Sequence, residues 1–304
     1  MDLVDFNEEV FNQISADYRT FAESLGFANI YPVPMSALRG DNVVERSTST
    51  DWYTGPTMIQ LLETVETQTG EAENFEGFRM PVQYVNRPNL DFRGFCGTIA
   101  AGEIRPGETI TTLPSGKSSQ VTRIVTADGD LDLAVAGEAV TLTLSDEIDI
   151  SRGDLIYTGS KPLFGDNVSA ELVWMHETPM QVGKEYLFKV STKSVYGTVT
   201  AVQHRVDVNT MEHIPADSLQ LNEVGMVTLS FNGPVALDPY TLVHGTGSFV
   251  VIDRMSNVTV GAGMVRGLAD GFRVYKRISD MTFEEKIMAY NKEVEAIVRK
   301  YFEG

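Results

Sequence analysis

The chain has 304 residues, 42% of them hydrophobic, which is enough for two or three modest domains with buried cores. It carries 42 Asp and Glu against 24 Lys and Arg, a formal net charge of −18. This balance argues against nucleic-acid binding, which depends on clustered Lys and Arg, but it is compatible with a basic protein partner. No apolar run approaches the roughly 18 residues of a membrane span. Residues 1–25 carry several acids and lack a basic-then-apolar start, so no secretory signal is expected.

The single cysteine, Cys96, excludes an internal disulfide, which fits the reducing cytoplasm. It lies in the apolar run Gly94–Ile99. A small thiol in such a run is more often a buried core residue than a nucleophile. We therefore expect a cytoplasmic protein in which Cys96 packs in a core.

Residues 5–25 are predicted to form an amphipathic helix. Its apolar residues recur at spacings of three to four and form one stripe: Val10, Phe11, Ile14, Tyr18, Phe21 and Leu25. Asp5 and Glu8 have the spacing of a capping box. Residues 29–34 are expected to be extended and to lead into Ser36-Ala37-Leu38. This order of helix, strand and loop is that of the last unit of an α/β sheet.

A second helix is expected near Pro56, since proline suits the first turn of a helix. Its apolar face would be formed by Ile59, Leu62 and Val65. Residues 67–76 are rich in Glu, Thr and Gly, as is typical of a linker. A first domain is therefore predicted over residues 1–70.

From Phe78 the apolar pattern changes from helical spacing to alternation, and turn residues recur about every eight to twelve positions. The predicted strands include residues 97–108 (two strands and a tight turn), 119–125, 138–144 and 154–157. A second all-β stretch runs from Ser169 to about Val274, after a break at Gly165–Asn167. Because closed barrels remove exposed strand edges, we predict two β-barrels, over 77–163 and 168–277.

The last residues, 280–304, predict another helix. Apolar residues recur at three and four positions: Phe283, Ile287, Tyr290, Val294, Ile297 and Tyr301. Thr282 and Glu285 have the spacing of a capping box. The expected fold class is thus mainly β, with an α/β remnant at the start and a helix at the end.

Three segments imitate phosphate-binding motifs without their key residues. Gly102–Thr109 has the spacing of a Walker A loop, but Glu108 stands at the lysine position and Pro106 has no N–H. Gly116–Ser119 has a similar ending and is better explained as a hairpin tip. Residues 91–94, Asp-Phe-Arg-Gly, imitate the element that senses a γ-phosphate, but they lead directly into a predicted strand. All three are interpreted as parts of strands and turns.

The histidines do not have the spacing of metal ligands. They are His176, His204, His213 and His244, spread over the second all-β stretch. Each is expected to be a surface or core residue. No Gly-x-Ser-x-Gly motif occurs, so a nucleophilic hydrolase is not indicated and no catalytic residue is assigned.

Ser36-Ala37-Leu38 looks like the last guanine-recognition loop of GTPases. In those proteins the Asp of an Asn-Lys-x-Asp motif accepts two hydrogen bonds from guanine, which adenine cannot offer. The Ser-Ala loop supports this aspartate and adds a backbone N–H to guanine O6. Asp2 precedes Ser36 by one predicted helix and one predicted strand, a suitable separation. The candidate guanine-binding residues are therefore Asp2, Ser36, Ala37 and Leu38.

Longer segments carry a more specific resemblance. They are SALRGDNVV, WYTGPTMIQLLETVE, the run from FRMPVQYVNRPNLDFRG to DEIDISRGDLI, VWMHETPMQVGKEYLFKV, RVDVNTMEHIPADSLQLNEVG, LDPY and NVTVGAGMV. Over nearly the whole chain the sequence closely resembles the large subunits (subunit 1) of bacterial sulfate adenylyltransferases, which are relatives of elongation factor Tu. The segments PNLDFRG, GDLDLA and DEIDISRGD separate this family from translation factors.

The resemblance implies a GTPase domain followed by two β-barrels. It also implies an activity: GTP-stimulated formation of adenosine 5′-phosphosulfate from ATP and sulfate. The smaller partner subunit of the heterodimer would transfer the adenylyl group, while this subunit would bind GTP with Mg²⁺ and hydrolyse it. No nucleic-acid or membrane partner is implied.

The phosphate-binding loop, the switch segments and the Asn-Lys of the base motif are missing from these residues, so we expect an N-terminally truncated GTPase domain. Affinity for GTP comes largely from the triphosphate and Mg²⁺. This chain alone is therefore expected neither to bind GTP tightly nor to hydrolyse it. Two alternatives stay open: a non-catalytic two-barrel module that binds the smaller subunit, and a translation-factor-like tRNA binder, which the acidic charge disfavours.

Overall fold

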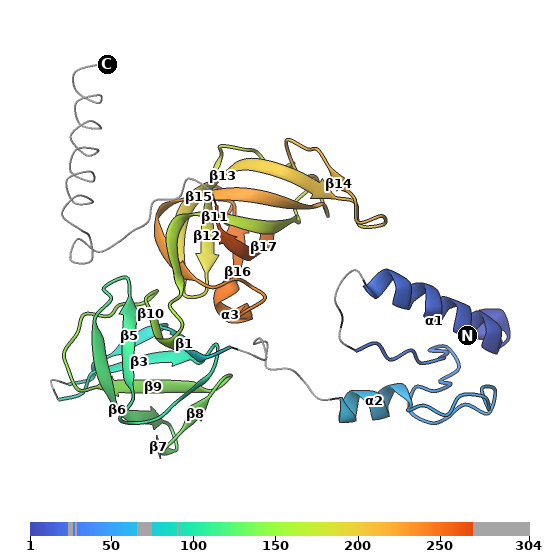
Figure 1. Ribbon diagram of the computed structural model, residues 1–304, viewed down its shortest axis with the longest axis horizontal. Helices are drawn as coiled ribbons and strands as arrows, with labels where there is room; N and C mark the ends of the chain where they lie inside the picture. Colours follow the sequence, from blue (N-terminus) through green and yellow to red (C-terminus); the bar gives the residue numbers. More distant parts are fainter. Residues whose placement is uncertain (24–26, 28, 66–74, 90, 270–304) are drawn as a thin grey trace. The chain divides into compact units, whose positions relative to one another are not determined.

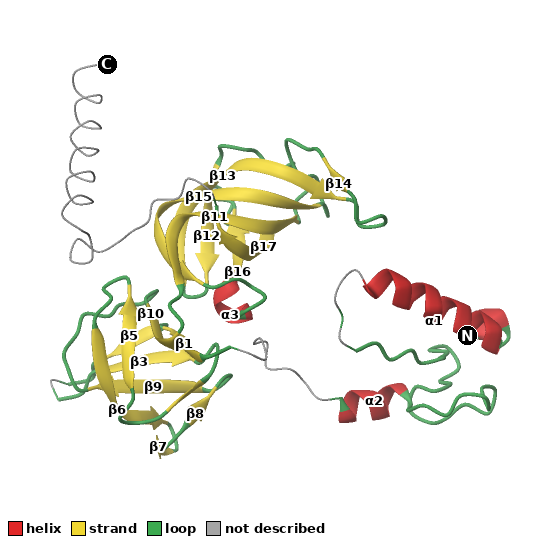
Figure 2. Cartoon of the chain, viewed as in Figure 1, coloured by secondary structure: helices red, strands yellow, loops and turns green. Residues whose placement is uncertain are grey.

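The computed structural model describes residues 1–23, 27, 29–65, 75–89 and 91–269. The chain divides into two compact units, Met1–Gln68 and Thr69–Gly304 (Figure 1). The described secondary structure of the first unit is helical, and that of the second is almost entirely strand (Figure 2). The predicted terminal helix over 280–304 lies outside the described residues. Among the helices that the structure describes, none is long and apolar enough to cross a membrane.

The first unit contains a 3-10 helix, η1 (Asp2–Val4), and two α-helices, α1 (Glu8–Glu23) and α2 (Met58–Thr64). α1 begins later than predicted, because Asp5 and Phe6 have left-handed backbone conformations with φ of 49° and 55°. Asn7 caps the helix instead: its Oδ1 accepts a hydrogen bond from the Val10 N–H at 3.1 Å. The predicted Asp5–Glu8 capping box is therefore wrong.

The predicted apolar stripe of α1 is exposed in part: Phe11 packs against Trp52 and Tyr53, whereas later residues of the stripe face solvent. Ile14 and Tyr18 are 59% and 52% exposed, and only Ala22 of this helix is buried. The predicted apolar face of α2 is exposed as well: Ile59, Leu62 and Val65. No strand is assigned within the extended residues 29–34. Much of these apolar faces, which normally pack in an α/β layer, is therefore left uncovered by the described residues of this unit.

α2 begins close to where the sequence predicts, at a complete capping box. The Thr57 hydroxyl accepts the Gln60 N–H, and the Gln60 side chain accepts the Thr57 N–H at 3.1 Å. The cap lies just after Pro56, so the start of the helix was predictable from the sequence.

The first barrel of the second unit is built from ten short strands. They are β1 (Gly77–Pro81), β2 (Tyr84–Asn86), β3 (Gly94–Thr98), β4 (Glu103–Ile104), β5 (Thr109–Leu113), β6 (Ser118–Thr126), β7 (Gly129–Leu131), β8 (Ala134–Val135), β9 (Ala139–Leu144) and β10 (Leu155–Gly159). The antiparallel order is β1-β10-β5-β6-β9-β3-β2. The ring closes where the Arg79 N–H donates to the Ala101 oxygen at 2.9 Å and the Ala100 N–H donates to the Arg79 oxygen at 2.7 Å.

The Walker-like segment Gly102–Thr109 lies in this barrel as strand, turn and strand, and β5 rather than a helix follows it. Gly102 has φ of 74° and lies against the Gly77 backbone. The imitation of a phosphate loop therefore comes from the glycines of two tight turns.

Cys96 lies on β3 and is half-buried, with its Sγ 3.2 Å from Thr141 Oγ1. The prediction of a buried core cysteine is thus only partly correct. The core of the barrel is formed by buried apolar side chains, among them Phe78, Met80, Phe95, Ile110, Ile124, Leu142 and Ile156.

The second barrel has longer strands. They are β11 (Leu163–Trp174), β12 (Glu185–Val190), β13 (Lys193–Val206), β14 (His213–Ile214), β15 (Val224–Leu237), β16 (Ser248–Ile252) and β17 (Thr259–Leu268), with the short helix α3 (His244–Gly247) before β16. The order β12-β16-β17-β11-β15-β13 closes through β12–β13 pairing. Aromatic rings fill its core, including Trp174, Tyr186, Phe188, Phe231 and Phe249. The predicted mainly-β fold class is confirmed.

The predicted break at Gly165–Asn167 falls inside β11. The strand begins at Leu163, and its pairing with β15 shifts register between Gly165 and Asn167. These residues form a β-bulge. Bulges and linkers use the same turn-forming residue types, so the sequence pattern does not distinguish them.

Candidate guanine-binding site

Asp2 precedes α1 in the sequence and Ser36 follows it, and the structure brings the two residues together. The Met1 amino group donates a hydrogen bond to the Met35 oxygen at 2.8 Å. Beside it the Ser36 hydroxyl donates to the Asp2 carboxylate. Ser36 is only 1% exposed, so its hydroxyl is held in place. The two residues that sequence spacing paired as a guanine site are therefore neighbours.

Electrostatics keep the Asp2 carboxylate ionised. The hydrogen bond from Ser36 is the largest cause that lowers the pKa of Asp2 below its ordinary value. A backbone hydrogen bond and the positive charges of the Met1 amino group and Arg39 act in the same direction. At neutral pH this carboxylate is an acceptor only, as recognition of the guanine N1–H and amine requires.

A tight turn positions Ser36. The Arg39 N–H donates to Ser36 Oγ at 3.3 Å, and the Gly40 N–H donates to the Ser36 oxygen at 2.8 Å. The Ser36 N–H donates to the Asp41 oxygen at 3.2 Å. The hydroxyl thus accepts from Arg39 while it donates to Asp2, which fixes the direction of its proton.

Sequence reasoning missed the residue that anchors this turn, Asn42. It is buried, and its Nδ2 donates to the Pro34 oxygen and to Thr50 Oγ1, both at 2.8 Å. Its Oδ1 accepts the Ser47 N–H at 2.8 Å. An asparagine directly after Gly40-Asp41 was the available signal, because Asn often bonds to nearby backbone in turns.

Ala37 and Leu38 form the exposed tip of the loop. Leu38 is 87% exposed. Within the described part of the chain, neither backbone N–H donates a hydrogen bond to another residue. The site therefore offers an ionised acceptor, Asp2, and an unused backbone donor next to Ser36.

The site residues offer hydrogen-bonding groups of both kinds, an ionised acceptor at Asp2 and free backbone donors at the loop tip among the described residues. Within the described ranges, no group of three or more His, Cys, Asp or Glu could hold a metal ion. Asp91-Phe92-Arg93-Gly94, which imitates a γ-phosphate sensor, leads into β3 as predicted. Chemically, the site can provide hydrogen bonds to a planar heterocycle.

Two histidines that look isolated in the sequence are stacked in the structure. The rings of His204 on β13 and His213 on β14 have centroids 3.7 Å apart at 15°. Burial and the neighbouring His213 lower the pKa of His204. Their contact depends on the pairing of β13 with β14, which the sequence does not specify.

Comparison with known proteins defines the class first. Residues 167–266 match the family described as GTP-eEF1A C-terminal domain-like. Sup35 complexed with GDP has a TM-score of 0.60 at 20% identity, covering 88% of this chain and 66% of that chain. Elongation factor SelB from Methanococcus maripaludis, in its apo form, has a TM-score of 0.54 at 18% identity, covering 70% of this chain and 46% of that chain. These similarities show that the chain shares its fold with part of these proteins.

Sequence relatives then define the family. Sulfate adenylyltransferase subunit 1 of Laribacter hongkongensis is 50% identical over 99% of this chain and 62% of its own length, and that of Shewanella woodyi gives the same figures. The subunit of Chromobacterium violaceum is 54% identical over 87% of this chain and 56% of its own length. The chain thus spans about 62% of the length of the first two relatives. Over the part that it covers, it belongs to the family of sulfate adenylyltransferase subunit 1, as its sequence predicts.

Proposed function

We propose that this chain is part of the GTP-binding regulatory subunit of sulfate adenylyltransferase, a cytoplasmic nucleotidyltransferase of sulfate assimilation. The enzyme would convert ATP and sulfate to adenosine 5′-phosphosulfate and diphosphate, driven by GTP hydrolysis. The support is an identity of about 50% with subunit 1 proteins over 99% of the chain.

The first unit would recognise the guanine base. The observation that carries this role is the hydrogen bond from the Ser36 hydroxyl to the Asp2 carboxylate. Asp2 would accept the guanine N1–H and exocyclic amine, and the Ala37 N–H would donate to O6. Adenine offers neither this pair of donors to Asp2 nor the O6 acceptor to the Ala37 N–H, so the site would discriminate against it.

This chain alone would neither bind GTP tightly nor hydrolyse it. When bound, Mg²⁺ supplies charge neutralisation at the phosphates. None of the candidate residues Asp2, Ser36, Ala37 and Leu38 would contact that end of the nucleotide. Base contacts alone are worth about a few kcal/mol, which corresponds to a Kd of about 1 mM.

The partner would be the smaller, adenylyl-transferring subunit, which would bind ATP and sulfate. The support is the designation "subunit 1" in the relatives, which implies a second subunit. The two barrels would then act as an interaction module within the heterodimer.

Nucleoside titration monitored by NMR tests the base site. We expect guanosine to shift the amide resonances of Ala37 and Leu38 with millimolar affinity, and adenosine to leave them unchanged. Asp2→Asn should abolish the preference, whereas Asp17→Asn on the exposed face of α1 is the matched control. A micromolar affinity for GTP, or equal shifts with adenosine, would contradict the proposal.

A further inference from the structure

One end of the second barrel gathers loops from distant parts of the sequence. β11, β13 and β16 run toward this end and β12, β15 and β17 run away from it, because all neighbouring pairs are antiparallel. Residues 174–185, 205–224 and 252–259 therefore meet there, and we call them the far end (Figure 1). Backbone hydrogen bonds join the loops, such as Met180 N–H to Leu219 oxygen at 2.9 Å and Met175 N–H to Val260 oxygen at 2.8 Å.

Exposed large hydrophobic residues of the second unit are concentrated at the far end. Seven of the eleven exposed large hydrophobic residues in the described residues 75–269 lie on it: Met175, Val182, Val208, Met211, Leu221, Met255 and Val258. Met255 is 87% exposed. Concentrated exposed apolar side chains mark interaction sites, and methionine adapts its shape to a partner.

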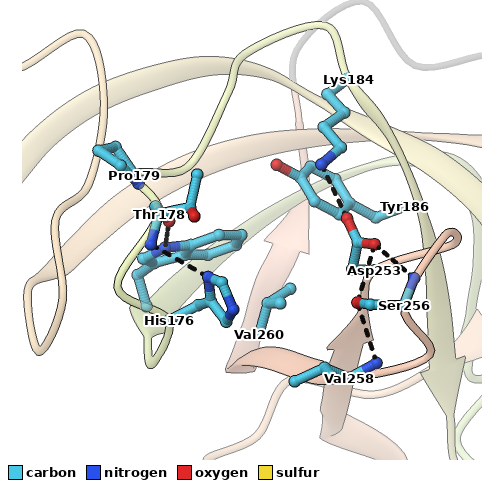
Figure 3. A pocket seen from close by; sticks show the side chains of 10 residues that line it. His176, Thr178, Pro179, Lys184, Tyr186, Asp253, Ser256, Val258 and Val260 are labelled. Carbon is cyan, nitrogen blue, oxygen red and sulfur yellow. Dashed lines mark hydrogen bonds and ion pairs between the residues drawn. The ribbon is translucent and has the colours of Figure 1, made fainter.

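A pocket of about 270 Å³ opens in this surface (Figure 3). Its walls include Trp174 and Tyr186, whose rings pack edge to face with centroids 5.7 Å apart. The pocket is smaller than the roughly 300–1,000 Å³ of small-molecule sites, so it suits one inserted side chain better than a nucleotide. Buried aromatic anchors in such pockets carry much of the affinity of protein interfaces.

The pocket has a rigid polar edge. Lys184 Nζ points across Tyr186 to Asp253 Oδ2 at 2.7 Å, and Asp253 accepts hydrogen bonds from the turn at Ser256 (Figure 3). On the opposite wall the Thr178 N–H donates to His176 Nδ1 at 3.1 Å. These groups therefore already satisfy one another within the barrel.

The rim is acidic. The far end contains seven Asp and Glu against three Lys and Arg. Each cation is already paired: Lys184 with Asp253, Arg205 with Glu223 and Arg254 with Glu185. Three exposed acids have no ion-pair partner among the described residues, namely Glu177, Glu212 and Asp217. A partner surface with Lys and Arg would complement them.

We propose that the far end docks the second subunit of the same enzyme through a basic amphipathic segment, one apolar side chain of which enters the pocket. The inference rests on the proposed function, which supplies the partner. Three segments that carry the family resemblance pass through the far end: VWMHETPMQVGKEYLFKV, RVDVNTMEHIPADSLQLNEVG and NVTVGAGMV. The opposite end of the barrel is not free, because Asp238 there contacts Arg79 of the first barrel.

Binding of the 304-residue chain to the second subunit, measured by calorimetry at 50 and 300 mM salt, tests the inference. Met255→Glu and Val258→Glu should each weaken binding at least tenfold. Glu177→Gln combined with Asp217→Asn should weaken it mainly at low salt and flatten its salt dependence. Tyr84→Glu, on the first barrel, places the same charge at another exposed hydrophobic residue and should bind as the unmodified chain does.

The outcomes separate the inference from the proposed function. If the unmodified chain binds and the far-end variants bind equally well, the docking site is wrong and the proposed function stands. If the unmodified chain does not bind at 50 µM, both the proposed partner and the docking site fail. If the chain alone is a dimer that Met255→Glu makes monomeric, a second copy occupies the face and the inference is overturned. Circular dichroism confirms folding of each variant, and Met175→Glu, on another loop, replaces any variant that does not fold.

Discussion

Arg79 on β1 and Asp238, just after β15, form a buried ion pair that joins the two barrels. Arg79 Nε lies 3.0 Å from Asp238 Oδ2, and the two side chains are 1% and 5% exposed. The remaining guanidinium N–H groups donate to the Phe78, Thr158 and Ser160 oxygens at 2.6 to 3.1 Å. A planar fork with five donors matches this set of acceptors, and an ammonium group does not.

Arg79→Met should lower the free energy of unfolding of the second unit by about 3–5 kcal/mol, because it leaves Asp238 buried without its cation. Arg79→Lys should also be less stable than the unmodified chain, because an ammonium group does not match the set of acceptors around Arg79. Urea denaturation followed by circular dichroism measures both. The control is Arg123→Met, which removes the exposed bidentate pair with Asp130 and should cost at most about 1 kcal/mol. Equal losses for the two methionine variants would show that the buried pair has no special role.

Ser36→Ala should raise the pKa of Asp2 toward its ordinary value, because the Ser36 hydroxyl is the largest cause of the lowering. Since the folded-state pKa is depressed, the stability that this carboxylate contributes is complete above the ordinary value of 3.8 and is lost as the pH falls through the folded-state pKa. Titration of the Asp2 side-chain carbon signal by NMR measures the shift. Arg39→Met should raise the pKa less, since the charge of Arg39 is the last of the causes. An unchanged pKa in Ser36→Ala would contradict the assignment.

Local patterns predicted the strands of the first barrel well. Residues 119–125 were expected as a strand, and β6 spans Ser118–Thr126 with alternating buried and exposed side chains over its first half. Such alternation follows from the two-residue period of a strand and needs no knowledge of its neighbours. The guanine-loop prediction had a similar basis, because the separation of Asp2 from Ser36 matches a known order of elements. The structure brings the two side chains together, while binding of guanine at this site stays a prediction.

Features that depend on distant partners were not predictable. Arg79 and Asp238 are 159 positions apart in the sequence, so no spacing rule relates them. The stripe of α1 predicted burial, yet Ile14, Tyr18 and Phe21 face solvent, because periodicity shows which face is apolar and not whether anything covers it. Residues 29–34 have the composition of a strand, but a strand also needs a hydrogen-bonded neighbour.

The stability of the second barrel should fall as the pH drops from about 7 to 5. Burial first, and then the neighbouring His213, hold the pKa of His204 below its ordinary value of 6.5. Because the folded state binds this proton less readily than the unfolded state, stability is complete above 6.5 and decreases as the pH falls toward the folded-state pKa. Glu171 opposes the shift.

His213→Ala removes one cause and leaves burial, so it should make the decrease smaller without abolishing it. Thermal unfolding at half-unit pH steps, compared with His176→Ala at a separate loop position, measures this effect. A steeper decrease in His213→Ala would contradict the interpretation of the stacked pair.

Substitutions at two glycines of the Walker-like segment distinguish the cost of backbone strain from the cost of a steric clash. Gly102 and Gly107 both have positive φ, 74° and 93°. A Cβ at Gly102 would lie 1.8 Å from the Gly77 backbone oxygen, whereas one at Gly107 would meet nothing within 4 Å. Gly107→Ala should therefore cost only the left-handed strain, about 1–2 kcal/mol. Gly102→Ala should cost clearly more, because backbone atoms of β1 must move and the barrel closes nearby, through the bridge between Arg79 and Ala101. Urea denaturation of the two variants measures the difference. Equal costs would mean that the turn at Gly102 can shift away from β1, and that this contact does not fix the closure of the barrel.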